Sequence, residues 1–188
     1  MEQPKPDHQD WTWVLDRPCD ECGFDTAGIE RTDIGAMMRS NAGQWRELLS
    51  NRGRVSTRPP GEPDEGPIWS ALEYGAHVRD IYRLSLERLR SMLSDDNPSF
   101  ADRDQNQMAI DGGYPTEDPT RVSYDLTVEA GRLADAVDRV GARQWDRPAR
   151  RSNGSVFTVE SFVRYTLHDV LHHVADVERG YRDLAEKN

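Results

Sequence analysis

The sequence of 188 residues predicts an all-α protein, an antiparallel four-helix bundle with long connections and an irregular N-terminal arm. Three observations carry this prediction. Four segments repeat apolar residues at steps of three and four, which is the period of an amphipathic helix. Stretches rich in proline, glycine and asparagine separate these segments, and little of the chain alternates as a half-buried strand does. We expect one domain, with residues 1–25 as an extended arm and residues 26–188 as the bundle.

The first two helices are expected on either side of a proline-rich loop. Thr32 or Asp33 can cap the free backbone N–H groups of the first helix, which runs to Leu49. Residues 51–67 contain four prolines and three glycines, a composition that predicts a loop. Pro67 suits the first turn of a helix, and the apolar period of residues 68–93 predicts a second, long helix.

The second half of the chain predicts two further helices and a hairpin. Residues 94–119 are polar and too long for a simple bundle connection, so we expect a functional or mobile loop. A third helix is expected over residues 119–140, ended by Gly141. The dipeptide Asn153–Gly154 predicts a tight turn within a short hairpin at residues 144–157. The fourth helix is expected from Thr158 to about residue 185.

Composition and charge exclude several classes of partner. The formal net charge of −10 repels phosphate backbones, and no basic run offsets it, so we expect no nucleic-acid partner. No apolar stretch approaches the roughly 18–20 residues that cross a bilayer, and the N-terminus lacks the pattern of an export signal. We therefore expect no membrane partner and a cytoplasmic location.

Histidines are the informative feature of the sequence. His168 and His172 are four residues apart, so a helix places both imidazoles on one face, one turn apart. Such a pair is a common metal-ligand arrangement, although it also arises by chance on helix surfaces. His77 lies mid-helix on the border of the inward face, where an unpaired polar group costs roughly 1–3 kcal/mol. A neutral core histidine bonded to a carbonyl or tyrosine is the alternative, but together the three histidines favour a metal site.

The neighbours of the pair define the expected surroundings of the ion. His173 follows His172 directly, so it points about 100° away and is expected at the surface or in a supporting role. Asp169, Asp176 and Glu178 could orient the N–H groups of ligand histidines, with a solvated helix face as the alternative, which we expect for Glu178. Three imidazoles leave a four-coordinate ion with one open position, and zinc suits them, with nickel, copper or iron as alternatives.

Two further groups of residues carry weaker signals. Cys19 and Cys22 form a C-x2-C unit, which is half of a zinc knuckle, a redox dithiol, or an exposed pair without a role. A knuckle needs two more ligands, which a partner chain could supply, and we expect the exposed pair. Arg147, Arg150 and Arg151 could hold a carboxylate or phosphate of a cofactor, with a solvated surface as the alternative.

Two segments of the sequence resemble the DinB/YfiT-like superfamily. Residues 67–80 (PIWSALEYGAHVRD) look like the family's second helix, with Trp69 at its start and a ligand histidine at His77. Residues 165–173 (YTLHDVLHH) are similar to the family's H-x3-H, or E-x3-H, in a later helix. The resemblance runs nearly end to end. It implies a four-helix bundle, often dimeric, with a divalent metal held at His77, His168 and His172.

The resemblance also implies a chemistry. Characterised members include thiol S-transferases that use bacillithiol or mycothiol, and mycothiol-dependent maleylpyruvate isomerase. The leading hypothesis is therefore a metal-dependent thiol S-transferase whose partners are a small-molecule thiol and an electrophile, with mycothiol as the first choice and bacillithiol or glutathione as alternatives. A metallohydrolase with Glu73 or Asp80 as its acid or base is the second hypothesis. The third is a non-enzymatic metal-binding stress or regulatory protein that assembles into a homodimer.

Overall fold

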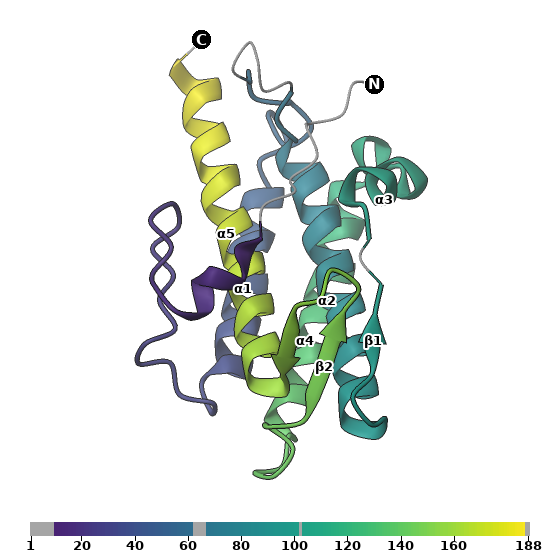
Figure 1. Ribbon diagram of the computed structural model, residues 1–188. Coiled ribbons are helices and arrows are strands. Elements are labelled where there is room, and N and C mark those ends of the chain that lie inside the picture. The colour runs from purple at the N-terminus through teal and green to yellow at the C-terminus, as the bar shows by residue number, and fades with distance from the viewer. Residues whose placement is uncertain (1–9, 62–66, 102, 187–188) are drawn as a thin grey trace.

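A computed structural model describes residues 10–61, 67–101 and 103–186 (Figure 1). Four long helices form a bundle: α1 (Ile34–Leu49), α2 (Ala71–Ser94), α4 (Pro119–Asp138) and α5 (Val159–Glu186). Shorter elements connect them: η1 (Trp11–Leu15), β1 (Ser99–Phe100), α3 (Gln105–Gly112), η2 (Tyr114–Thr116), β2 (Pro148–Arg151) and β3 (Val156–Thr158). The predicted four-helix bundle is confirmed.

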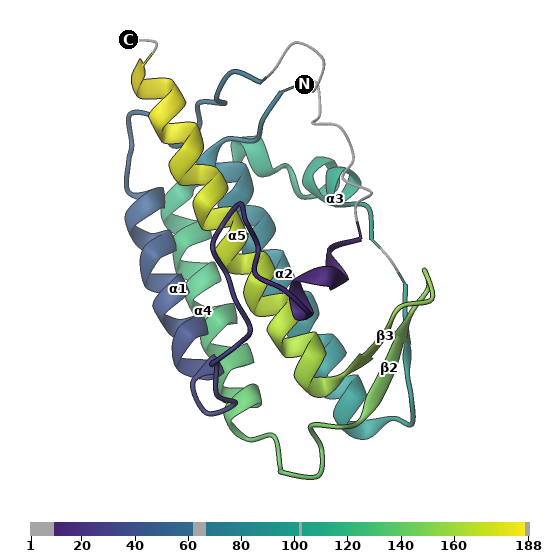
Figure 2. The same cartoon turned by 60° about the vertical axis from the view of Figure 1, so that its left-hand side comes forward.

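The four long helices pack in the ring order α1, α4, α2, α5. Figures 1 and 2 show that α1 and α5 run in one direction and α2 and α4 in the other. The prediction of an antiparallel bundle therefore holds for the neighbours α1/α4 and α2/α5, and is wrong for α2/α4 and α1/α5. The reason lies in the connection after α2, which runs back along the bundle before α4 begins.

Helix boundaries follow their caps. α2 begins at Ala71 rather than near Pro67, because Ser70 and Glu73 form a capping box. The Ser70 hydroxyl accepts from the Glu73 N–H at 3.3 Å, and the Glu73 carboxylate accepts from the Ser70 N–H at 2.9 Å. α1 begins after Asp33 as predicted, although the Asp33 side chain makes no capping hydrogen bond.

A small sheet makes the class all-α only approximately. The predicted hairpin is present as the antiparallel pair β2 and β3. β1 adds to β2 in parallel, with Ser99 opposite Arg150 and Phe100 opposite Arg151. The sequence did not predict β1, since two residues cannot show an alternating pattern and the partner strand lies about 50 positions later.

The two segments expected to be irregular contain ordered elements. The stretch expected as a loop at residues 94–119 holds β1, α3 and η2, and Asp104 caps α3 by accepting from the N–H groups of Asn106 and Gln107. Of the arm expected at residues 1–25, residues 1–9 lie outside the described part of the chain. Its remainder contains η1 and a turn at the cysteines, so it is not simply extended.

Buried polar contacts tie three helices of the bundle together. The Tyr82 hydroxyl donates to Asn41 Oδ1 at 2.8 Å, and Asn41 Nδ2 donates to the Val170 carbonyl at 3.1 Å. These bonds join α2, α1 and α5 and fix the rotation of α5 about its axis. None of the described helices is both long and apolar enough to cross a membrane.

Candidate metal centres

Helix α5 presents two interleaved pairs of polar side chains. His168 and His172 form one i, i+4 pair, and Asp169 and His173 form another. Neighbouring residues on a helix are rotated by about 100°, so the two pairs point to different sides of α5. The first pair meets the N-terminal arm, and the second lies beside His77 of α2.

Cys19, Cys22, His168 and His172 form the first cluster, which we call the Cys/His cluster. Their potential ligand atoms all lie within 4.8 Å of one another, a property that no other His, Cys, Asp or Glu group has in the described residues. Cys19 Sγ lies 3.7 Å from His172 Nδ1. Cys19, His168 and His172 are buried, and Cys22 is half-buried. The expectation of an exposed cysteine pair is therefore wrong.

A tight turn brings the two cysteines to α5. The Cys19 N–H donates to the Phe24 carbonyl at 2.8 Å, and the Gly23 N–H donates to the Cys19 carbonyl at 2.8 Å. Gly23 has φ +74°, a left-handed conformation that glycine adopts without steric cost. Both thiols are free, and burial raises the pKa of the Cys22 thiol to about 11.

The imidazole of His168 lacks a hydrogen-bond partner at one nitrogen. Its Nε2 is buried and accepts from or donates to no described group, which costs about 1–3 kcal/mol unless something binds there. Trp11 and Phe24 cover the ring, with centroid distances of 5.7 and 5.4 Å. Burial, followed by the nearby His172, lowers the pKa of His168 to about 4, so the imidazole is neutral at pH 7 as a ligand must be.

His77, Asp169 and His173 form the second cluster, which we call the α2/α5 cluster. The ring of His77 lies 5.1 Å from that of His173 and 5.2 Å from that of Trp69. His77 Nδ1 is buried and has no hydrogen-bond partner among the described residues. Burial, followed by the charge of His173, lowers the pKa of His77 to about 3.

Two carboxylates hold His173 between them. Asp176 Oδ2 lies 3.0 Å from His173 Nδ1, and Asp169 Oδ1 lies 3.4 Å from His173 Nε2. Burial alone would lower the pKa of His173, but the bonds to Asp169 and Asp176 raise it to about 10. His173 is thus a protonated, largely buried side chain rather than a surface residue.

Asp176 also reaches the Cys/His cluster. Its Oδ1 lies 3.7 Å from His172 Nε2, and Glu21 lies 3.6 Å from the same nitrogen. Asp176 thus contacts the rings of both His172 and His173, whereas Asp169 contacts the ring of His173. Glu178 is exposed.

Both clusters border one cavity of about 710 Å³ between α2 and α5. His77, Asp169 and His173 line it, as do His168 and His172. The other walls come from the connections: Trp11 of the arm, the start of α3, and the β2–β3 hairpin. The volume lies within the range of about 300–1,000 Å³ that is typical of small-molecule sites.

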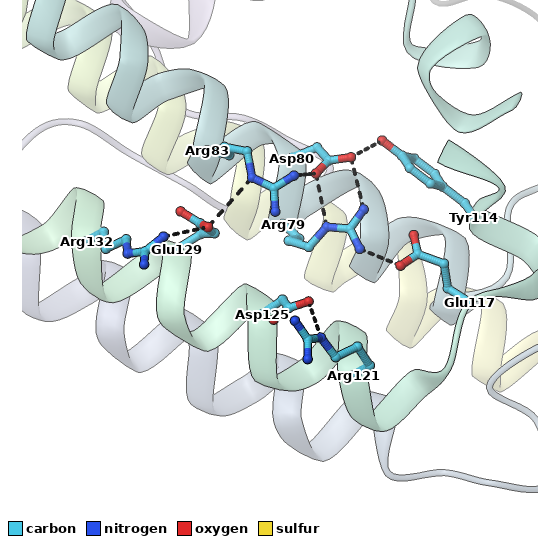
Figure 3. A network of polar contacts seen from close by, with 9 residues as sticks. All are labelled: Arg79, Asp80, Arg83, Tyr114, Glu117, Arg121, Asp125, Glu129 and Arg132. Atoms are coloured by element: carbon cyan, nitrogen blue, oxygen red, sulfur yellow. Dashed lines mark hydrogen bonds and ion pairs between the residues drawn. The ribbon is translucent and has the colours of Figure 1, made fainter. Parts of the chain in front are cut away.

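The two carboxylates that we named as acid/base candidates are held in ion pairs. Glu73 binds Arg58 and the Ser70 cap, and its pKa is lowered by Arg58 although burial opposes the shift. Asp80 pairs with Arg79 at 3.0 Å and accepts from the Tyr114 hydroxyl at 2.7 Å (Figure 3). These contacts lower the pKa of Asp80 against its burial. Both carboxylates are therefore engaged in contacts that stabilise the fold.

Of the three predicted anion-binding arginines, one reaches the cavity. Arg151 lines it together with Arg103 of the α2–α4 connection. Arg147 instead donates to the Met92 carbonyl at 2.6 Å and so closes the end of α2. Arg150 is exposed and is not part of the cavity wall.

The predicted ligands His77, His168 and His172 are thus divided between neighbouring clusters. His168 and His172 lie with the cysteines, and His77 lies beside His173. Sequence reasoning missed the role of Asp169 and His173, although their four-residue spacing was a signal of the same kind as that of His168 and His172. It also missed that two histidines of the same chain, His168 and His172, lie beside the C-x2-C unit.

The donor types fit metal ions of different kinds. Two thiols and two imidazoles make a closed set of four, which suits zinc in a structural role. Two imidazoles and a carboxylate make an open set of three beside a cavity, which suits a divalent ion with room for a further ligand.

Comparisons with known proteins bear on the fold. No family model matches the chain, and no curated protein matches it. A solved structure is similar over most of both chains: YfiT from Bacillus subtilis, described as a probable metal-dependent hydrolase with an unusual four-helix bundle topology. The TM-score is 0.73 at 16% identity, covering 86% of this chain and 93% of YfiT. At this identity the likeness establishes the fold alone, and that fold is the YfiT-type four-helix bundle expected from the resemblance.

Proposed function

We propose that the protein is a metal-dependent enzyme whose divalent ion is held by His77, Asp169 and His173 at the wall of the cavity. The observation that carries the proposal is His77, which lines the cavity and whose buried Nδ1 has no partner among the described groups. The donors of the three residues are not all within 4.8 Å of one another, so binding an ion requires a change of side-chain rotamer.

The surroundings of His173 support this assignment. Histidines that bind metals commonly donate their other N–H group to a carboxylate. Asp176 accepts from His173 Nδ1 at 3.0 Å and leaves Nε2 on the side of Asp169. Without an ion, the proton on His173 provides the positive charge between Asp169 and Asp176. A bound divalent ion would provide that charge instead. Metal binding is therefore expected to release a proton.

The proposed nucleophile is a low-molecular-weight thiol, as the resemblance implies, and mycothiol is the first example to test. A bound divalent ion would act as a Lewis acid that lowers the pKa of a thiol. Such a reaction needs no separate base, and Glu73 and Asp80 are tied up in ion pairs with Arg58 and Arg79. The thiol proton would pass to solvent when the thiol binds, and the thiolate sulfur would form a bond to an electrophilic carbon, whose leaving group departs with its electron pair.

The cavity offers this chain's own groups for positioning the reactants. Arg103 and Arg151 at the wall could bind a carboxylate of the electrophile. Aromatic side chains also line the cavity and would exclude water from the reacting atoms: Trp11, Trp69, Tyr74, Phe157, Phe162 and Tyr165. The sequence of roles is therefore binding by the arginines, activation at the α2/α5 cluster, and shielding by the aromatic wall.

Hydrolysis is the second candidate, favoured by the likeness to YfiT, which is described as a probable metal-dependent hydrolase. In this version water takes the place of the thiol. Asp176, which lies beside His173 and lines the cavity, is then the carboxylate best placed to move a proton.

Turnover assays with metal-loaded protein test the proposal. We expect mycothiol, bacillithiol or glutathione to react with a chromogenic aryl halide at least ten-fold faster with the protein than in buffer. His77→Ala should abolish this acceleration, and Arg90→Ala, an exposed change on the same helix, should leave it intact. Acceleration that survives His77→Ala or metal removal refutes the assignment.

Two further measurements separate the alternatives. Product release from an activated ester without any thiol would support the hydrolase, and inertness in both assays would favour a non-enzymatic metal-binding protein. Activity retained in His168→Ala supports the set His77, Asp169 and His173. Loss of both activity and the catalytic ion in that variant supports His77, His168 and His172.

A further inference from the structure

We propose that Cys19, Cys22, His168 and His172 bind a structural zinc ion that fixes the N-terminal arm to α5. This ion is separate from the catalytic one and does not depend on the proposed function. The arm residues concerned are 10–29, which run from η1 through the turn at the cysteines to Ile29.

Distances in the Cys/His cluster suit a tetrahedral ion. Zinc–sulfur bonds of about 2.3 Å and zinc–nitrogen bonds of about 2.0–2.1 Å place sulfur and nitrogen about 3.6 Å apart in a tetrahedron. Cys19 Sγ and His172 Nδ1 are 3.7 Å apart. The remaining donor pairs lie within 4.8 Å, a spacing that small side-chain rotations close.

The unpaired nitrogen of His168 is an independent sign of a ligand. His168 is 3% exposed and is one of the four residues of the Cys/His cluster, and its Nε2 is without a partner in the described chain. A hydrogen bond from either thiol would have satisfied it, but no such bond is formed. A cation at the centre of the cluster satisfies this nitrogen and the sulfurs together.

His172 is oriented as a ligand by charges on its far side. Its Nδ1 faces Cys19, while its Nε2 lies 3.6 Å from Glu21 and 3.7 Å from Asp176. A ring with one nitrogen on the metal and the other N–H toward carboxylates is the usual arrangement in zinc sites. The turn at Gly23 holds both thiols on the side of this ring.

Four protein ligands leave no open position, so the ion has a structural role. Apolar packing also holds the arm, because Val14 and Phe24 are buried in the core. Trp11 packs on the rings of His168 and His172, and Arg164 donates to the carbonyls of Thr26 and Ile29. Zinc would fasten the segment between these contacts and thereby hold Trp11 in place as a wall of the cavity.

Cobalt substitution of the full-length protein tests this site. The chain has only two cysteines, so a sulfur-to-cobalt charge-transfer band can come from Cys19 and Cys22 alone. We expect metal-stripped, reduced protein to bind one cobalt ion with this band, and zinc to displace it. The double variant Cys19→Ser/Cys22→Ser should lose the band, and His172→Ala should weaken cobalt binding at this site at least ten-fold. Asp20→Asn, in the same turn but outside the donor set, is the matched control and should behave as wild type.

Hydrogen exchange gives a second readout that does not require a histidine variant to fold. Zinc should slow exchange in residues 10–29 of the wild type and leave it unchanged in the double cysteine variant. Absence of the band in reduced protein, or cobalt affinity unchanged in both His168→Ala and His172→Ala, would overturn the proposal. Protein that has been isolated with a Cys19–Cys22 disulfide and that binds no cobalt once this disulfide is reduced would do the same. Failure here leaves the turnover test of His77 unaffected, since that test reads a different ligand set.

Discussion

Replacing Asp176 by asparagine should weaken the two metal centres unequally. Asp176 accepts from His173 Nδ1 at 3.0 Å, which is a hydrogen bond, but lies 3.7 Å from His172 Nε2, where Glu21 stands equally near. Loss of a carboxylate that orients a ligand histidine typically lowers metal affinity about 10–100-fold, or about 1.4–2.7 kcal/mol. We expect a loss in this range at the α2/α5 cluster. At the Cys/His cluster Glu21 should limit the loss to a few-fold.

Competition with chelators of graded affinity measures both effects in one titration. The cobalt–thiolate band reports the Cys/His cluster, and total metal content reports the sum of the two centres. Glu178→Gln removes the same charge from an exposed position two residues further along α5 and should change neither affinity. Equal losses at both centres, or a loss confined to the thiolate centre, would refute the placement of His173 as a ligand held by Asp176.

Two other predictions concern arginine contacts. Asp80→Asn removes one of the two carboxylates that pair with Arg79, while Glu117 remains 2.6 Å away, and should cost about 2 kcal/mol of unfolding free energy at pH 7, measured by urea denaturation. Because the pKa of Asp80 is below 3.8 in the folded chain, this difference should persist above about pH 4 and shrink as the pH falls further; a difference constant down to pH 2 would contradict it. Arg151→Ala should raise KM for an anionic electrophile about ten-fold with little change in kcat, whereas the exposed Arg150→Ala should change neither; equal effects would remove Arg151 from the binding wall.

The sequence predicted the positions of the helices more accurately than their relative directions. Apolar periodicity and caps located the four long helices to within a few residues, because burial and backbone hydrogen bonding act locally. The start of α2 was misjudged because Pro67 is compatible with a first turn, while the capping box of Ser70 and Glu73 is the stronger signal. Helix direction depended on the path of a connection whose elements are too short to leave a pattern.

The spacing of residues within one helix was not sufficient to predict the candidate site. The run from His168 to His173 contains two overlapping pairs at helical spacing, and periodicity alone cannot decide which of them faces α2. That choice is set by the rotation of α5, which the bond from Asn41 to the Val170 carbonyl helps to fix. The cysteines were misread for a related reason. Their partners lie about 150 residues away, and only the folded chain brings them together.

Different parts of the chain position the metal donors and form the other walls of the cavity. Ring packing of the four helices sets the positions of His77, Asp169 and His173, so any change that rotates α2 or α5 disturbs the metal donors. The other walls come from the arm, from the connection after α2 and from the hairpin, each of which also buries apolar side chains in the core, among them Val14, Tyr114 and Phe157. The exposed residues of such connections can vary at little cost in stability. We therefore expect changes in α2 and α5 to alter reactivity, and changes in the connections to alter the choice of substrate. The Cys/His cluster is the point where the arm is attached to α5, the helix that carries residues of both clusters.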